Sequence, residues 1–165
     1  REVCLSLAEM MLHLSLSLPR TEARALAEEA LTSGRALKKF EEWITRQGAV
    51  SLALPEASYT ESVYAERSGY ACAIDTEAIG NLSVTLGGGR RQKTDEIDHT
   101  AGIILHFTLG DYIEKGAPMA TLYTSARPEA LTAVKQELPS LVRLDEQKSS
   151  EMPPLIYKIV TGEDV

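Results

Sequence analysis

Apolar residues recur at helical spacing along the first 18 residues of the chain. They form one apolar stripe along the helix, and further apolar residues occupy the opposite side. The stripe consists of Val3, Leu7, Met10, Met11, Leu14 and Leu18, and the opposite side of Cys4, Leu5, Leu12 and Leu16. A helix that is apolar on all sides must be covered on all sides. We therefore expect part of its cover to come from residues upstream of Arg1, in a larger protein of which this chain is a fragment.

The alternative for this segment is the apolar core of a signal peptide. Glu2, Glu9 and His13 interrupt the apolar run, and a small-residue cleavage site does not follow it. The pattern therefore favours a helix of the folded protein.

Two further amphipathic helices are predicted after Pro19, which cannot continue the first helix. Each has an apolar face that we expect to point inward: Leu26, Ala27, Ala30 and Leu31 in residues 21–34, and Leu37, Phe40 and Ile44, with Trp43 beside them, in residues 35–48. Residues 1–48 are thus predicted to be a helical segment, and residues 49–58, which contain one proline, a connector.

From Tyr59 onward apolar and polar residues alternate, which predicts strands. The alternation is broken by helices capped at Asp75 and begun near Pro128. The elements expected in order are strands over 63–65 and 70–74, a helix over 76–86, a buried strand over 97–107, a hairpin over 110–124, a helix over 128–138, and strands over 140–144 and 155–160. The fold class is therefore α+β: a helical segment, then a small β-unit with inserted helices over residues 59–165.

Composition and charge narrow the classes of partner. The chain is 44% hydrophobic and 25% charged, which is typical of a globular protein, and its net charge is −7. An acidic chain lacks the electrostatic footprint for nucleic acid or an anionic membrane surface, and no apolar run is long enough to span a bilayer. Cys4 and Cys72 stand alone in apolar contexts, which predicts buried thiols without a disulfide and a reducing compartment.

The hairpin "GDYIEKGAPMATLYT", residues 110–124, is similar to the barrel-sandwich hairpin of lipoyl and biotinyl carrier domains. Those domains carry their cofactor on a lysine at the hairpin tip. Here Lys115 lies in the preceding turn and Lys135 within the following helix, so we expect the hairpin fold without a cofactor.

Other candidate chemistries lack a complete pattern. The stretch "GGGRRQK" contains glycines and cations suited to phosphate, but it follows the C-terminal end of a helix, where the dipole opposes an anion. Asp95, Glu96 and Asp98 are interpreted as a solvated loop, and His99 and His106 as residues on opposite faces of a strand. We expect neither a metal site nor an active site within these 165 residues.

Taken together, the motifs of residues 63–124 strongly resemble the C-terminal domain of pyrimidine-nucleoside phosphorylases, the family that includes thymidine phosphorylase. The resemblance rests on Ser68-Gly69-Tyr70, Ile74-Asp75, Ile79-Gly80, Leu86-Gly87, Gly89-Arg90, Ile97-Asp98-His99, Gly102-Ile103, Gly110-Asp111 and Lys115-Gly116. The upstream "SGRALKKFEEWITRQG" is similar to the same family, so the resemblance covers nearly the whole chain.

The resemblance implies a two-lobed, homodimeric, cytosolic enzyme that splits a pyrimidine nucleoside with phosphate into free base and pentose 1-phosphate, without a prosthetic group. It places residues 1–48 in the α/β lobe, and the phosphate-binding, catalytic and base-holding residues upstream of Arg1, in a missing N-terminal lobe. Two alternatives stay open: a related phosphorylase that acts on nucleoside monophosphates, and a non-catalytic binding or assembly module on the same fold. The second predicts a polar first helix, unlike the one here.

One segment of the chain is expected to take part in the reaction of such an enzyme. Three consecutive glycines give the backbone conformational freedom, and the charged residues after them suit a loop that meets the opposing lobe when the lobes close. We call residues 87–98 the closure loop, and a purely connecting loop is the alternative. Its candidate residues are Gly87, Gly88, Gly89, Arg90, Arg91, Lys93 and Asp98.

Overall fold

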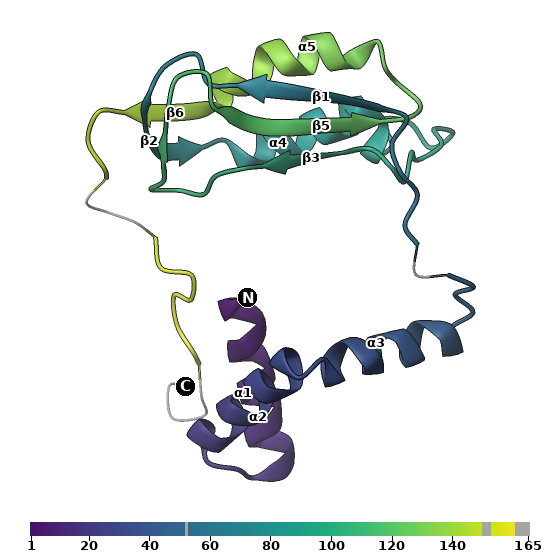
Figure 1. Cartoon of the computed structure of the whole chain (residues 1–165), viewed down its shortest axis with the longest axis vertical. Helices are drawn as coiled ribbons and strands as arrows, with labels where there is room; N and C mark the ends of the chain where they lie inside the picture. The colour runs from purple at the N-terminus through teal and green to yellow at the C-terminus, as the bar shows by residue number, and fades with distance from the viewer. Residues whose placement is uncertain (52, 150–152, 161–165) are drawn as a thin grey trace. The chain divides into compact units, whose positions relative to one another are not determined.

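The computed structural model describes residues 1–51, 53–149 and 153–160. The chain divides into two compact units, one comprising Arg1–Leu54 together with the stretch from Pro153 onward, the other Pro55–Met152 (Figure 1). Helices and small antiparallel sheets occur in the same chain, so the α+β class is confirmed.

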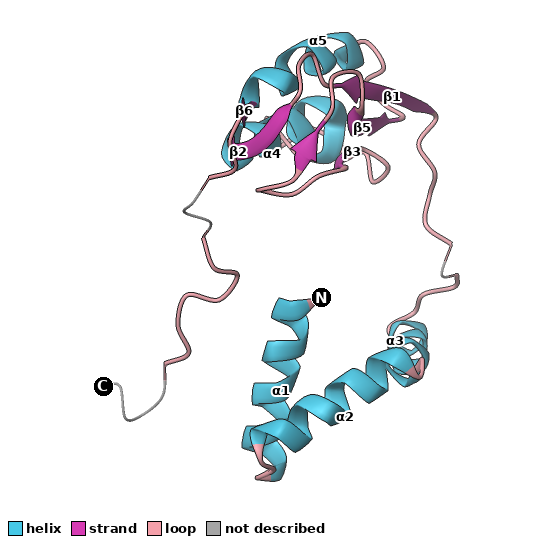
Figure 2. Cartoon of the chain, turned by 60° about the vertical axis from the view of Figure 1, so that its left-hand side comes forward, coloured by secondary structure: helices cyan, strands magenta, loops and turns pink. Residues whose placement is uncertain are grey.

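The first unit is built of helices, as Figure 2 shows. They are α1 (Glu2–Leu16), α2 (Arg20–Thr32) and α3 (Arg35–Arg46), close to the predicted bounds. Leu5 of α1 and the small residues Ala23 and Ala27 of α2 are buried, and the two helices pack against each other. Glu9 is buried in the same contact and is paired with Arg20 Nε at 2.7 Å, so its charge is compensated.

The apolar faces of α1 and α3 differ from the prediction. Leu5, assigned to the second face of α1, is buried, whereas Leu7, Met11 and Leu14 on the main stripe are 61%, 71% and 74% exposed. On α3, the face expected inward is open: Leu37 and Trp43 are 62% and 53% exposed. Within the described residues α1 packs mainly against α2, so one face is covered and the periodic pattern alone cannot say which.

These open faces should make the isolated chain self-associate, because contiguous exposed apolar surface drives association. We expect the apparent mass from light scattering to rise with concentration, and the double change Leu7→Ser and Met11→Ser to suppress that rise. Leu54→Ser removes an apolar residue outside the helices that is more exposed, at 85%, and is the control. A strictly monomeric parent chain, or equal behaviour of the two variants, would contradict this expectation.

The second unit contains two three-stranded antiparallel sheets among its described residues. The first has the order β1–β5–β3 and the second β4–β2–β6. The strands are β1 (Tyr59–Tyr64), β2 (Gly69–Ile74), β3 (Gly102–Leu105), β4 (Tyr112–Ile113), β5 (Pro118–Thr124) and β6 (Val142–Asp145). β5 is the central strand of the first sheet, with Leu122 opposite Glu61 on one side and Ile103 on the other.

Two helical segments pack against this unit's apolar side chains. They are α4 (Thr76–Ser83), which runs into the π-turn η1 (Val84–Gly88), and α5 (Ala130–Glu137), which runs into the 3-10 turn η2 (Leu138–Leu141). As predicted, Asp75 caps α4 by accepting a hydrogen bond from Ala78 N at 2.9 Å. α5 lies along β1 and β5 (Figure 1). The core between these elements holds Val63, Leu82, Leu86, Ala120, Leu122, Val134 and Leu138.

Two predicted strands need correction. Residues 155–160 form no strand in the described stretch 153–160, and Leu155 and Tyr157 are exposed. A short apolar run becomes a strand only where a neighbouring edge pairs with its backbone. The strand expected over 97–107 is confined to β3, so His99 and His106 flank it and do not share its faces.

Candidate functional site

The closure loop leaves η1 through a tightly packed glycine turn. Gly87 has φ +111° and is buried, and a Cβ added there would lie 3.2 Å from Asp98 Cβ. A Cβ on Gly88 would lie 2.9 Å from Ser83 Oγ and 3.1 Å from its carbonyl oxygen. We expected these glycines to supply freedom. The structure indicates instead that they are needed for positive φ and close approach.

Asp98 joins the base of the loop to the end of β5. Its Oδ1 accepts hydrogen bonds from Thr100 N at 2.9 Å and Thr100 Oγ1 at 2.6 Å. Its Oδ2 accepts from Ser125 N at 2.6 Å and Ala126 N at 2.9 Å, and its own N–H donates to Gly87 O at 2.9 Å. We refer to this set of hydrogen bonds as the Asp98 clamp. The interpretation of Asp98 as a solvated loop residue was therefore wrong.

Burial alone would raise the pKa of Asp98. The hydrogen bonds from Thr100, Ser125 and Ala126 favour the ionised form more strongly, and the pKa of the carboxyl lies well below its ordinary value. The carboxylate of Asp98 is thus charged at neutral pH and held by hydrogen bonds.

Buried Thr124 extends the clamp toward the helix side. Its Oγ1 lies 2.8 Å from Leu86 O, accepts a hydrogen bond from Arg127 N at 3.0 Å, and lies 3.3 Å from Asp98 Oδ2. The end of η1, the base of the loop and the turn after β5 are therefore one hydrogen-bonded assembly, although the segments lie far apart in the sequence.

The outer part of the loop is organised by Asp95. Its Oδ2 accepts hydrogen bonds from Arg91 N at 3.0 Å and Gln92 N at 3.2 Å, and these bonds lower the pKa of the carboxyl. Its carbonyl oxygen accepts from Arg90 Nε at 3.1 Å. Arg127 Nη2 lies 3.8 Å from Asp95 Oδ2 and Arg127 Nη1 3.4 Å from Val84 O, so Arg127 links the loop to η1.

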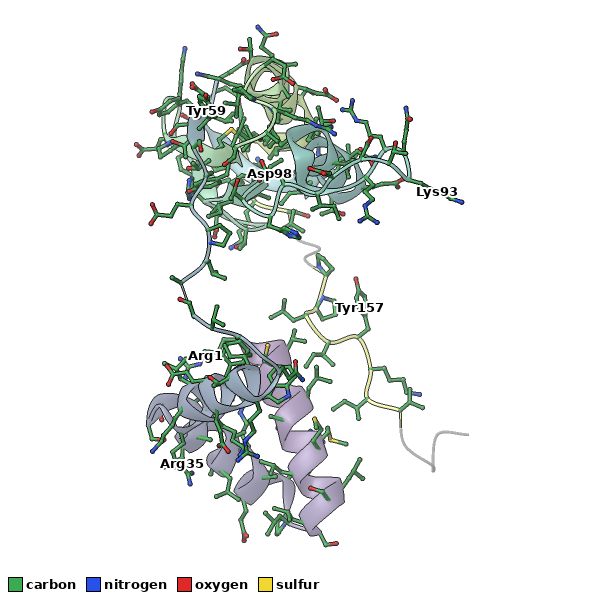
Figure 3. All side chains as sticks on the ribbon, turned by 90° about the vertical axis from the view of Figure 1, so that its right-hand side faces the viewer. Arg1, Arg35, Tyr59, Lys93, Asp98 and Tyr157 are labelled. Atoms are coloured by element: carbon green, nitrogen blue, oxygen red, sulfur yellow. The ribbon has the colours of Figure 1, made fainter. Side chains whose placement is uncertain are left out.

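The structure brings some predicted site residues together and separates others. Gly87 meets Asp98, and Arg90 and Arg91 gather around Asp95, whereas Lys93 stands exposed at the outer end of the loop (Figure 3). A surface cavity of about 450 Å³ lies beside the loop, and its lining includes side chains of both charges as well as neutral ones. The lining residues are Thr85, Arg91, Gln92, Asp95, Arg127, Glu129 and Ala130.

Sequence reasoning missed Asp95, Thr100, Thr124 and Arg127 as parts of this assembly. Thr100 had a local signal, because an Asp followed two residues later by a hydrogen-bonding residue is typical of an Asx turn. Thr124 and Arg127 had no such local signal, since they come close to the loop only after β5 has joined its sheet.

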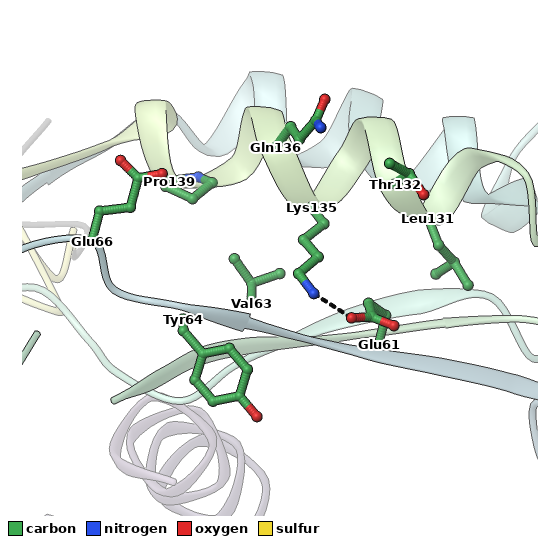
Figure 4. A pocket seen from close by; sticks show the side chains of 9 residues that line it. All are labelled: Glu61, Val63, Tyr64, Glu66, Leu131, Thr132, Lys135, Gln136 and Pro139. Carbon is green, nitrogen blue, oxygen red and sulfur yellow. Dashed lines mark hydrogen bonds and ion pairs between the residues drawn. The ribbon is translucent and has the colours of Figure 1, made fainter. Parts of the chain in front are cut away.

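A second surface cavity of about 450 Å³ lies between β1 and α5 (Figure 4). Its floor includes Val63 and Leu131, and an ion pair between Lys135 and Glu61 crosses it. Lys135 is one of the two lysines considered for a carrier role. Its ammonium group is engaged with the neighbouring strand.

The cysteines are less buried than expected. Cys4 is exposed on α1 and Cys72 is half-buried, and across the described residues both are unpaired thiols. Also within those residues, no cluster of three His, Cys, Asp or Glu side chains is placed to hold a metal ion. None of the described helices is both long and apolar enough to cross a membrane.

Comparison with known proteins identifies a matching domain family and similar enzymes. Residues 70–141, which include the closure loop and the Asp98 clamp, match the family model described as the pyrimidine nucleoside phosphorylase C-terminal domain. The pyrimidine-nucleoside phosphorylase of Bacillus subtilis (strain 168) is 36% identical over 146 residues, covering 85% of this chain. That of Staphylococcus aureus (strain USA300) is 38% identical over 146 residues, again covering 85% of the chain.

The chain matches the C-terminal portion of pyrimidine-nucleoside phosphorylases. The resemblance drawn from the sequence motifs is therefore confirmed. The chain spans 33% of the length of these relatives, and the family match identifies that portion as C-terminal.

Proposed function

We propose that this chain is the C-terminal part of an enzyme that cleaves pyrimidine nucleosides with phosphate, releasing the free base and a pentose 1-phosphate. The observation that carries the proposal is the 36–38% identity to phosphorylases over 85% of the chain. The substrates are then a pyrimidine nucleoside and phosphate, and the enzyme is a cytoplasmic homodimer whose remaining portion carries the catalytic and substrate-binding residues.

Within that enzyme the second unit serves as scaffold. The two sheets supply a lipoyl-like barrel-sandwich core, although β4 and β5 of the expected hairpin lie in different sheets, and Lys135 of α5 pairs with Glu61 and does not carry a cofactor. The open apolar faces of α1 and α3 are covered by the remaining portion of the protein, which is consistent with their exposure here.

The closure loop is the segment through which this chain contributes to the reaction. Arg90, Arg91 and Lys93 are exposed cations near one another in an otherwise acidic chain. When the lobes close, they contact the opposing lobe, which excludes water from the site and holds the closed state. A connecting loop needs no ordered charges, whereas hydrogen bonds to Asp95 hold the side chain of Arg90 and the backbone of Arg91.

The direct test is an assay of the full-length protein. We expect release of uracil from uridine or thymine from thymidine only when phosphate is present, together with formation of a pentose 1-phosphate. Release from nucleoside monophosphates alone would favour the nucleotide-cleaving branch instead. If no pyrimidine substrate is cleaved, the proposal is wrong and the alternative of a non-catalytic binding or assembly module is favoured.

A further inference from the structure

The hydrogen bonds at the base of the closure loop leave it little freedom to move as a flexible lid. Asp98 uses both carboxylate oxygens, and its partners are Thr100, just after the loop, and Ser125 and Ala126 in the turn after β5. Three of the four contacts are to backbone N–H groups at 2.9 Å or less, and those of Ser125 and Ala126 have a fixed geometry once β5 is in its sheet.

Close packing at the glycines constrains the same base from the other side. The β-carbon of Asp98 faces Gly87 so closely that an added Cβ there would lie at 3.2 Å. Gly88 is equally close to Ser83 at the end of α4. The base of the loop is therefore seated between α4 and the end of β5, and shifting it would break both contacts.

A second anchor holds the outer part of the loop. Arg127, from the turn after β5, reaches both Asp95 and Val84 O. Asp95 in turn binds the backbone of Arg91 and the side chain of Arg90. The Arg90 side chain and the backbone of Arg91 are thus held by contacts that lead through Asp95 to Arg127, in the turn after β5.

We propose that Asp98 is a positioning residue that holds the closure loop in its working shape before the lobes meet. This inference rests on the closure role proposed above and adds how the loop achieves it. A loop that is already ordered loses little conformational freedom when it docks, so more of its contact energy remains to stabilise the closed state. Asp98 does this without contacting substrate.

Trypsin cleavage of the 165-residue chain tests the clamp directly, because Arg90, Arg91 and Lys93 are all within the loop. We expect Asp98→Asn to raise the initial cleavage rate in the loop by about tenfold or more, through local opening. Thr100→Val removes one hydroxyl donor and keeps the carboxylate, and should give a smaller rise in a chain that still folds. Cleavage at Lys135, inside α5, reports global unfolding and should stay unchanged in Thr100→Val.

Asp111→Asn is the matched control, since Asp111 closes its own turn by accepting from Thr108 N and Thr108 Oγ1 outside the loop. Equal loop cleavage in Asp98→Asn, Thr100→Val and Asp111→Asn would overturn the inference whatever the enzyme does.

The full-length enzyme separates the clamp from the closure role. There we expect Asp98→Asn to lower kcat while KM for the nucleoside changes little, because binding residues are elsewhere and closure is impaired. Faster trypsin cleavage of the loop in Asp98→Asn, together with an unchanged kcat, would contradict both the closure role of the loop and the positioning role of Asp98. That result would leave the proposed phosphorolysis unaffected.

Discussion

Asp98→Ala should lower the free energy of unfolding of the second unit by about 3 kcal/mol, because a charged acceptor is removed and several partly buried donors lose their partner. Urea unfolding followed by tyrosine circular dichroism measures this, since the only Trp, Trp43, lies in the first unit and most tyrosines in the second. Asp111→Ala removes an exposed acceptor and should cost clearly less. Equal losses would mean that the clamp does not stabilise the unit.

The contribution of the Asp98 carboxylate to the free energy of unfolding has a defined pH dependence. The pKa of Asp98 is lowered in the folded state, so its stabilising effect is fully present above the unfolded pKa of about 4 and declines as the pH falls below that value. The stability difference between the parent chain and Asp98→Asn should therefore be constant from pH 5 to about 7 and shrink toward pH 2. A difference that grows on acidification would contradict the assigned charge state.

Residues 1–165 alone should release no free base from uridine or thymidine with phosphate, at any concentration of either. In the described part of the chain the carboxyl groups with a lowered pKa are committed to an ion pair with Arg24, to turns and to the clamp, and the cavities beside β1 and beside the closure loop each contain an ion pair. Release of base can be followed by the change in ultraviolet absorbance, with the full-length enzyme as positive control. Sustained turnover by the isolated chain would show that a catalytic site lies within it.

Local patterns predicted the elements that depend on local forces. Helical spacing marked α1, α2 and α3, and Asp75 was recognisable as a cap because its partner Ala78 is three residues away. The face that each helix buries was not predictable for α1 or α3. That choice depends on which neighbours are present, and an amphipathic period does not name them.

The ordered loop lay outside what sequence patterns can reveal. Its glycines and charges are typical of a mobile surface segment, yet Asp98 is held by Ser125 and Ala126, 27 and 28 residues further along the chain. Such a bond exists only after β5 has joined its sheet, so the chain's local composition carries no trace of it. For the same reason the apolar run of residues 155–160 suggested a strand although no edge pairs with it within the described stretch 153–160.

Steady-state kinetics of Arg90→Ala in the full-length enzyme test the account's central claim, that this chain acts on the reaction through the closure loop. We expect kcat to fall by about tenfold, with the melting temperature nearly unchanged because an exposed side chain is removed. Arg143→Ala, an exposed arginine on β6, is the matched control and should leave both quantities as they are. Wild-type kcat in Arg90→Ala, or a loss of activity matched by a fall in melting temperature, would show that the loop is scaffold and plays no part in closure.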